Sequence, residues 1–235
     1  MTGRQVYENC EIEGRTDYIF GYNATAYFKN CKINTIGAAD KKNGGYIVAT
    51  KGLKEGAGAD AVKYGYIFDG CTLGTTGEVI TSAEYAAADE AGTLKGTEIV
   101  EGTVSLARGW DTAMTVAFIN CDISSAYSLE AYGEKTMVDG VESKDDKNDR
   151  YTKMNAAPVA SQLFEYNNKG AGALTQDMID TAVDGVIADL CTVMTEAQAT
   201  EYTTLTTIFA AENGKLIYAD SWDGQPVQTA TITIK

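Results

Sequence analysis

The sequence predicts an all-β fold, a right-handed parallel β-helix, on three observations. The first is a short box that occurs four times: an aromatic residue, any residue, Asn or Gly, Cys, any residue, and Ile or Leu. Its cysteines are Cys10, Cys31, Cys71 and Cys121, so the box recurs after 21, 40 and 50 residues. A unit near 20 residues, with longer units that contain inserted loops, is typical of a solenoid. The second observation is a series of short β-type runs. The third is the composition: the chain has 24 glycines, and few windows of residues 1–125 have helical spacing.

The β-type runs supply the predicted strands. They are bounded by turn residues and fall at 18–20, 24–28, 45–50, 64–68 and 115–119. In a coil of this kind the four box cysteines are expected to stack inward as small core residues. Their Asn neighbours in three of the boxes are expected to form an amide ladder at a bend. We therefore expect inert core thiols, because the close cysteine pairs of a zinc site are missing from the sequence.

The second half of the chain predicts helices at the end of the coil. Residues 174–194 place apolar side chains at helical spacing, and residues 195–198 form a capping box for a further short helix. Such helices are expected to cap the coil or pack on it. The charged residues 138–150 predict a solvated loop.

We predict one β-helix domain over the whole chain. Its expected parts are coils over 1–135, a charged loop over 136–160, a segment with helices over 161–213, and a terminal strand or linker over 214–235.

The amino-acid composition limits the catalytic groups and the binding partners that the chain can have. The 235 residues include no histidine, which excludes Ser/His/Asp and Cys/His nucleophile systems and His-ligated metals. Any catalysis must use carboxylates, Tyr, Lys, Arg or backbone groups. The 19 Lys+Arg against 33 Asp+Glu give a net charge of -14, so we expect neither nucleic acid nor an anionic membrane surface as a partner.

Four stretches, in order along the chain, resemble motifs of the pectin methylesterase family. The family pattern I-E-G-x-V-D-F-I-F-G-x-A-x-A-x-F-x-N-C resembles residues 13–31, EGRTDYIFGYNATAYFKNC. Its L-G-R-P-W is similar to residues 105–110, its F-x-E-Y-x-x-x-G-A-G-A to residues 164–173, and its L-T-x-x-Q-A-x-x-Y-T to residues 194–203. Four motifs in family order are a far more specific signal than any one of them.

The resemblance implies a pectin-lyase-like parallel β-helix that hydrolyses the C6 methyl esters of pectin, giving pectate and methanol. Asp17 stands where the family has its nucleophile, and Arg108 where an arginine keeps that carboxylate charged and aimed. Phe20, Trp110 and Met154 match positions that contact sugar rings. The resemblance implies methylated polygalacturonate as the partner, no cofactor and no metal, and an extracellular, secreted enzyme, because pectin lies outside cells.

The resemblance also places a G-x-Q-D-T-L-Y segment shortly before the first box. That segment would supply the general acid/base Asp and a Gln that stabilises the oxyanion, and it is missing ahead of Tyr7. We therefore expect the C-terminal portion of a pectinesterase, impaired by on the order of 10² to 10³ for the oxyanion donors and 10² to 10⁴ for the acid. An open edge at the first coil is expected to allow self-association.

Two other functions stay open on the residues alone. A noncatalytic β-helix for carbohydrate binding or a structural surface role fits the missing acid, although a scaffold needs neither Asp17 nor Arg108. A polysaccharide lyase would want Ca²⁺-binding carboxylate clusters. Individual residues also have structural alternatives: a turn for Asp17, a surface ion pair for Arg108, and plain packing for Trp110 and for a Phe20 that points into the coil.

Overall fold

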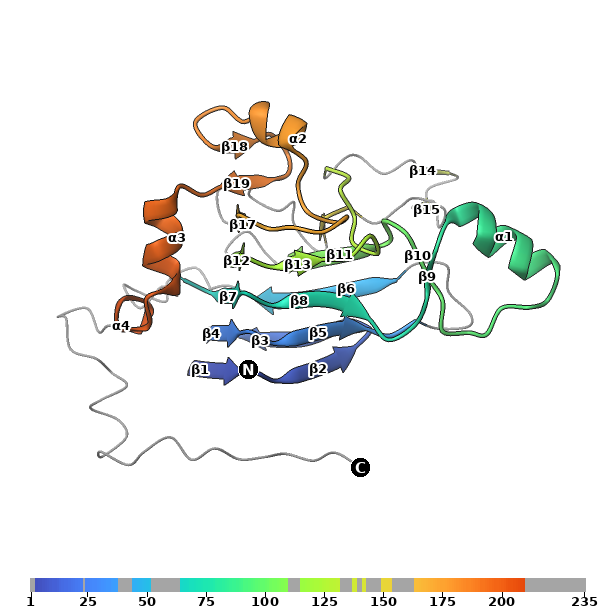
Figure 1. Ribbon diagram of the computed structural model, residues 1–235, viewed down its shortest axis with the longest axis horizontal. Helices are drawn as coiled ribbons and strands as arrows, with labels where there is room; N and C mark the ends of the chain where they lie inside the picture. Colours follow the sequence, from blue (N-terminus) through green and yellow to red (C-terminus); the bar gives the residue numbers. More distant parts are fainter. Residues whose placement is uncertain are drawn as a thin grey trace.

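Three sheets of parallel strands, with one antiparallel strand, β18, at the end of the largest, wind around one apolar core in the computed structural model of the chain (Figure 1). The structure describes residues 3–22, 24–37, 44–51, 64–109, 115–131, 137–138, 141–142, 149–153 and 163–209. The sheets have the strand orders β1-β4-β7-β12-β17-β19-β18, β13-β8-β5-β2 and β16-β11-β6-β3. Because each strand pairs with its counterpart one coil away, the predicted fold class, a right-handed parallel β-helix, is confirmed.

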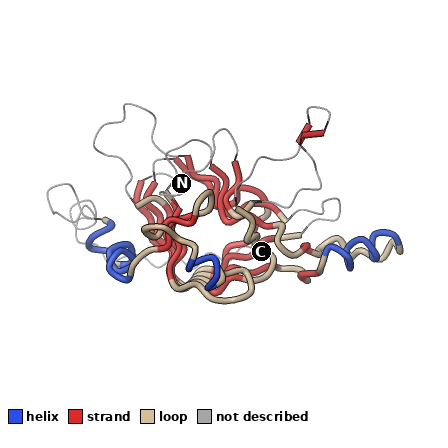
Figure 2. Tube along the Cα trace, turned by 90° about the horizontal axis from the view of Figure 1, so that it is seen from above, coloured by secondary structure: helices blue, strands red, loops and turns tan. Residues whose placement is uncertain are grey.

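Each coil contributes one strand to each sheet. The first coil contains β1 (Gly3–Glu8), β2 (Glu11–Gly14) and β3 (Thr16–Tyr22), and the second contains β4 (Ala24–Lys29), β5 (Lys32–Thr35) and β6 (Gly45–Lys51). The third contains β7 (Tyr66–Asp69), β8 (Thr72–Thr75) and β11 (Val104–Gly109), and the fourth contains β12 (Val116–Ile119), β13 (Asp122–Ile123) and β16 (Tyr151–Lys153). A fifth coil begins with β17 (Leu163–Tyr166). Seen from above, the strands lie in layers around a common axis (Figure 2).

Two further pairs of short strands lie outside the three sheets. An arm between β8 and β11 contains β9 (Val79–Ile80), α1 (Ser82–Glu90) and β10 (Ile99–Val100), and α1 projects away from the coil (Figures 1 and 2). The strands β14 (Met137–Val138) and β15 (Val141–Glu142) pair with each other.

The box repeat sets the register of the coils. Tyr7, Phe28, Phe68 and Phe118 face one another in neighbouring strands, and successive rings stack with centroids 4.8, 4.6 and 4.8 Å apart. The box cysteines follow the same order: three of them are buried, and Cys10 in the first coil is half-buried. The prediction that these thiols are small core residues is confirmed for Cys31, Cys71 and Cys121, and Cys10 packs against the edge of the same core.

The box asparagines turn the chain at the corner of each coil. Asn9, Asn30 and Asn120 have φ values of 54°, 51° and 54°, in the left-handed region that Asn tolerates better than most residues. The third coil uses Gly70 at this corner, which interrupts the row of amides. An amide contact of the expected kind joins the fourth and fifth coils, where Asn167 Nδ2 donates to Asn120 Oδ1 over 2.8 Å.

The helices at the end of the coil are shorter than predicted. The capping box is confirmed, because the Thr195 side chain accepts from the backbone of Gln198 at the start of α3 (Glu196–Thr203). That helix and α4 (Leu205–Ile208) pack on the outer face of the seven-stranded sheet. One helix over 174–194 is wrong: the segment forms α2 (Gln176–Asp180), β18 (Val186–Ile187) and β19 (Cys191–Val193). Left-handed backbone at Asp184 and Gly185 ends the helical pattern and turns the chain into the strands.

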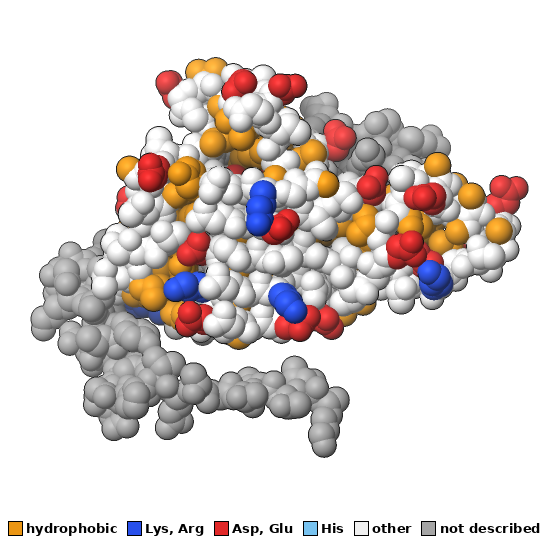
Figure 3. All heavy atoms as spheres, viewed as in Figure 1, with side chains coloured by type: hydrophobic (Ala, Val, Ile, Leu, Met, Phe, Trp, Pro, Cys, Tyr) orange, Lys and Arg blue, Asp and Glu red, His pale blue; other side chains and the backbone are white. Residues whose placement is uncertain are grey.

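The prediction of a solvated loop over 138–150 is wrong for residues 149 and 150, which the structure describes. Asp149 is 7% exposed and Arg150 is fully buried, because the Arg150 side chain reaches inside the last coil and pairs with Glu165. Most of residues 138–150, and all of 210–235, lie outside the described residues, so the division of the chain into parts stays a prediction. Acidic side chains outnumber basic ones on the face drawn in Figure 3, as the net charge of -14 leads one to expect.

None of the helices in the described segments is long and apolar enough to cross a bilayer.

The buried thiols make the stability of the fold sensitive to alkaline pH. A hydrogen bond with the Cys121 thiol, together with burial, raises the pKa of Cys71 to about 12 from 9.0. A raised pKa stabilises the folded chain fully below about pH 9, and this contribution is lost at about 1.4 kcal/mol per pH unit as the pH rises toward 12. We expect the urea midpoint to fall between pH 9 and 10.5, and to fall less in Cys71→Ala. An equal pH dependence in both proteins would refute this assignment.

Candidate functional site

The predicted nucleophile lies on a bulge in the first coil. Strand β3 pairs with β6 through Thr16 opposite Tyr46 and Ile19 opposite Val48, so three steps on β3 oppose two on β6. Asp17 sits within this irregularity with φ at 53°. A bulge of this kind bends the strand and re-aims its side chains. It sets the direction of every side chain that follows in β3.

The bulge breaks the simple alternation of side chains along this strand. In a regular strand Tyr18 and Phe20 would share one face and Ile19 would lie on the other, which is the basis of the alternative in which Phe20 points into the coil. Instead, Tyr18 and Ile19 both pack against the core, and Phe20 is 45% exposed. The exposed position of Phe20 excludes the alternative in which its ring points into the coil.

Asp17 and Arg108 meet although 91 residues separate them in the sequence. Arg108 lies near the end of β11, and its guanidinium Nη2 donates to Asp17 Oδ2 in a charge-assisted hydrogen bond. The two side chains are 19% and 20% exposed, so the pair is reachable from solvent but largely shielded. Asp17 Oδ1 is itself shielded from solvent and has no hydrogen-bond partner among the described residues. One carboxylate oxygen is therefore held by the arginine, and the other is uncommitted.

Tyr46 supports this pair from the strand that lies between the two partners. The Arg108 Cζ atom sits 4.3 Å from the centroid of the Tyr46 ring, a cation–π contact. Strand β6 pairs with β3 on one side and with β11 on the other, so the ring is fixed between the strands that carry Asp17 and Arg108. Tyr46 was not among the predicted site residues, because its contact with Arg108 depends on the register between strands, which a single sequence does not reveal.

The structure brings together three of the five predicted site residues. Asp17 and Phe20 share β3, and Arg108 reaches Asp17 from β11. Trp110 and Met154 lie outside the described residues, directly after β11 and β16, which pair with each other through Arg108 and Thr152. Within the described ranges, no group of three or more His, Cys, Asp or Glu side chains could hold a metal ion.

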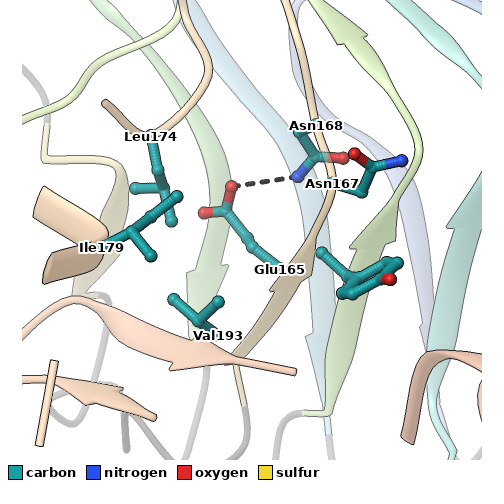
Figure 4. Close-up of a pocket in the computed structure, with 7 residues that line it drawn as sticks. Glu165, Asn167, Asn168, Leu174, Ile179 and Val193 are labelled. Carbon is teal, nitrogen blue, oxygen red and sulfur yellow. Dashed lines mark hydrogen bonds between the residues drawn. The ribbon is translucent and has the colours of Figure 1, made fainter. Parts of the chain in front are cut away.

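A small pocket lies elsewhere, at the last coil (Figure 4). It encloses about 270 Å³ with its mouth included and is lined by Glu165, Tyr166, Asn167, Asn168, Leu174, Ile179 and Val193. The Glu165 carboxylate is already engaged by Arg150, by the Tyr151 hydroxyl and by Asn168 Nδ2. The pocket therefore offers no free carboxylate for chemistry, and the Asp17–Arg108 pair is the better candidate site.

Fold and pair together define a class: a parallel β-helix protein with a carboxylate site on the outside of one sheet. Residues 1–88 match the family model described as Pectinesterase. The chain is 31% identical over 188 residues to the probable pectinesterase A of Neosartorya fischeri, which covers 79% of this chain and 42% of that relative. The relationship to the pectinesterase family that the motifs predicted is confirmed.

Solved structures show the same fold. The pectin methylesterase PemA from Erwinia chrysanthemi superposes with a TM-score of 0.53 at 21% identity, over 88% of this chain and 51% of that one. A pectin methylesterase in complex with a hexasaccharide gives a TM-score of 0.52 at 21% identity, with the same two coverages. The chain therefore spans about half the length of these structures, and 42% of the fungal relative.

Proposed function

We propose that this chain takes part in the hydrolysis of the C6 methyl esters of pectin, giving pectate and methanol. The observation that carries the proposal is the contact between Asp17 and Arg108, two family motif residues that the fold joins from β3 and β11. The curated relatives are named pectinesterases, and a solved neighbour is a pectin methylesterase in complex with a hexasaccharide. Methylated polygalacturonate is therefore the substrate class we infer.

In this mechanism the Asp17 carboxylate turns its Oδ1, which is buried in the substrate-free chain, toward the bound ester, and Oδ1 attacks the ester carbonyl carbon. A bond forms between Oδ1 and that carbon, the bond to the methoxy oxygen breaks, and methanol leaves once its oxygen gains a proton. Water then adds to the acyl carbon, which frees the galacturonate and restores the Asp17 carboxylate. Arg108 holds Oδ2 throughout and favours the charged form of the nucleophile.

The proton for methanol is assigned to a separate acid. The family resemblance gives this role to the Asp of a Gln-Asp-Thr segment. Residues 1–235 contain no Gln-Asp-Thr run. The assay for this proposal therefore has to detect slow as well as fast methanol release. Phe20, Trp110 and Met154 are proposed to pack against sugar rings, and the exposed Phe20 side chain is consistent with that role.

The test is methanol release from highly methylated pectin by the chain and by its Asp17→Asn variant. The proposal requires that the chain release methanol and that the variant not do so. Equal binding of methylated oligogalacturonate by both proteins, with no methanol from either, would instead favour the noncatalytic carbohydrate-binding function. We place the protein outside the cell, because its proposed polymer substrate is found there.

We also propose that the chain self-associates through its first coil. Strands β1, β2 and β3 are the terminal strands of their three sheets in the described part of the chain, and an uncovered strand edge can pair with another chain. We expect the mass measured by light scattering to rise with protein concentration. The Val6→Lys substitution, on the 42% exposed side chain of β1, should shift the equilibrium toward monomer. A constant monomer mass at every concentration would overturn this proposal.

A further inference from the structure

We propose that a buried chain of three hydroxyl groups, from Tyr18, Thr35 and Tyr127, positions Asp17 against Arg108. Tyr18 and Thr35 would then be positioning residues of the site, although neither touches the reacting atoms. The catalytic consequence rests on the proposed function. The structural consequence, the hold on Asp17, does not.

The three hydroxyls form a continuous line inside the coil. Tyr18 Oη lies 3.2 Å from Thr35 Oγ1, which lies 3.3 Å from Tyr127 Oη, and Tyr127 donates to the Gly74 carbonyl over 3.0 Å. Each hydroxyl has one proton to donate. Because Tyr127 gives its proton to Gly74, Thr35 donates to Tyr127 and Tyr18 donates to Thr35. The line therefore has one direction and is satisfied along its whole length.

The line connects the two strands that carry the proposed site. At one end, Tyr18 directly follows Asp17 on β3. At the other end, Tyr127 forms a bridge with Val104, the first residue of β11, which carries Arg108. Backbone bonds fasten this end: Val104 N–H donates to Ala126 over 2.9 Å, and Ser128 N–H donates to the Val104 carbonyl over 2.9 Å. The hydroxyls thus tie β3 to β11 through the interior, while the ion pair ties them outside.

Asp17 needs such a hold because its backbone is in an unfavourable region. Asp tolerates a φ of 53° better than most residues, but this conformation still costs free energy that the surrounding contacts have to offset. The inward turn of Tyr18 is one half of that bulge, and Gly14 leaves room for it. A Cβ added at Gly14 would lie 2.3 Å from Tyr18 Cβ. Releasing Tyr18 therefore relaxes the bulge and turns the Asp17 carboxylate away from Arg108.

The line stays intact over the pH range in which an esterase would work. Burial raises the pKa of Tyr18 well above its usual value, and it raises the pKa of Tyr127 in the same direction. Thr35 does not titrate in this range and is fully buried. The hold on Asp17 is thus a neutral hydrogen-bonded one and adds no pH dependence of its own near neutrality.

The experiment compares Thr35→Val with Thr35→Ser. Valine keeps the shape of the buried side chain and removes the central hydroxyl, whereas serine keeps the hydroxyl. The readout is the rate at which a water-soluble carbodiimide and an amine label Asp17, measured by peptide mass spectrometry. We expect Thr35→Val and Tyr18→Phe to speed labelling of Asp17 by about 3- to 10-fold, the factor for one lost neutral hydrogen bond. Thr35→Ser should label like the parent.

Tyr27→Phe is the matched control. It removes another hydroxyl of a buried tyrosine, one that donates to Asp69 over 2.6 Å and lies on a different sheet. Its Asp17 labelling should equal that of the parent. If Thr35→Val and Tyr18→Phe, with folding verified by urea midpoint, also label Asp17 at the parent rate, the positioning role is wrong.

The methanol assay separates this inference from the proposed function. If Asp17→Asn abolishes methanol release, the esterase proposal stands, whatever the hydroxyl variants do. If the hydroxyl line positions the nucleophile, Thr35→Val should lower the single-turnover rate by about the same 3- to 10-fold and leave oligogalacturonate binding unchanged. Faster labelling without any methanol from the parent would keep the hold on Asp17 and reject the catalytic role.

Discussion

Replacing Asp17 with Asn is expected to lower methanol release from methylated pectin by at least about 10³-fold, because the nucleophile is lost. The amide has nearly the same volume as the carboxylate, and its oxygen can still accept from Arg108 Nη2. The fold and the bulge at residue 17 should therefore survive the change. What disappears is the negative charge on the uncommitted oxygen, which has no other hydrogen-bond partner in the described structure.

The assay must allow for slow turnover by this chain. Acylation of Asp17 releases one methanol per chain whether or not the acyl group is later hydrolysed, and this step is itself slow when no acid protonates the methanol. Single-turnover experiments with the chain in excess over ester groups, followed for hours, therefore measure the step that belongs to Asp17. The complementary measurement is binding of a methylated oligogalacturonate, which should be equal for the parent and the Asn variant, because binding uses the sugar contacts.

Arg108→Lys is the graded control for this prediction. Lysine keeps a positive charge near Asp17 but loses the planar fork and the stacking of the guanidinium on Tyr46. We expect a loss of about 10- to 100-fold, smaller than that for Asp17→Asn, matching one charge-assisted hydrogen bond. Methanol release by Asp17→Asn at the parent rate would remove Asp17 from the mechanism. An Arg108→Lys variant as active as the parent would reduce the arginine to a simple counterion.

The coil was predictable because its signal repeats. A stack of Phe28, Phe68 and Phe118 requires aromatic residues at equal positions in successive coils, so the box spacing in the sequence is the register in space. The Asp17–Arg108 contact could be predicted only from the family motifs. Composition and spacing by themselves place the two residues 91 positions apart and say nothing of contact.

What the sequence missed depends on cross-strand geometry. Because of the bulge at Asp17, Tyr18 and Ile19 both pack against the core. The period of two along a regular strand cannot predict such an extra residue. The helix predicted over 174–194 failed because Thr192 and Val193 pair β19 with β17, and tertiary pairing outweighs an amphipathic pattern. The burial of Arg150 was hidden in a charged run, where arginine is usually solvated.

That buried arginine leads to the largest expected change in stability. Arg150→Met should destabilise the chain by about 3–5 kcal/mol, because it removes one partner of a buried ion pair and leaves the other charged. Arg150 Nε and Nη2 donate to the two oxygens of Glu165 over 2.6 and 2.7 Å. Its Nη1 donates to the carbonyls of Ser128 and Gly172, each over 2.8 Å. The substitution would remove the guanidinium donors of both carbonyls and of the Glu165 carboxylate at once.

The position of the pair explains why it matters for the coil. Glu165 faces Phe118 in the register, so it continues the aromatic stack with a carboxylate. Tyr151 Oη and Asn168 Nδ2 also donate to it, over 2.9 and 3.1 Å. The cluster thus closes the upper end of the ring stack with a hydrogen-bonded polar group. It also fastens β16, the strand that pairs with β11 beside Arg108.

Urea unfolding followed by circular dichroism measures the effect, with Lys95→Met as the control. Lys95 pairs with Glu78 over 3.2 Å, but their side chains are 71% and 62% exposed, so its loss should cost less than about 1 kcal/mol. The double variant Arg150→Met, Glu165→Leu should recover part of the loss, because it leaves no unpaired charge inside the coil. If Arg150→Met unfolds at the same urea concentration as Lys95→Met, the cluster does not hold the end of the coil together.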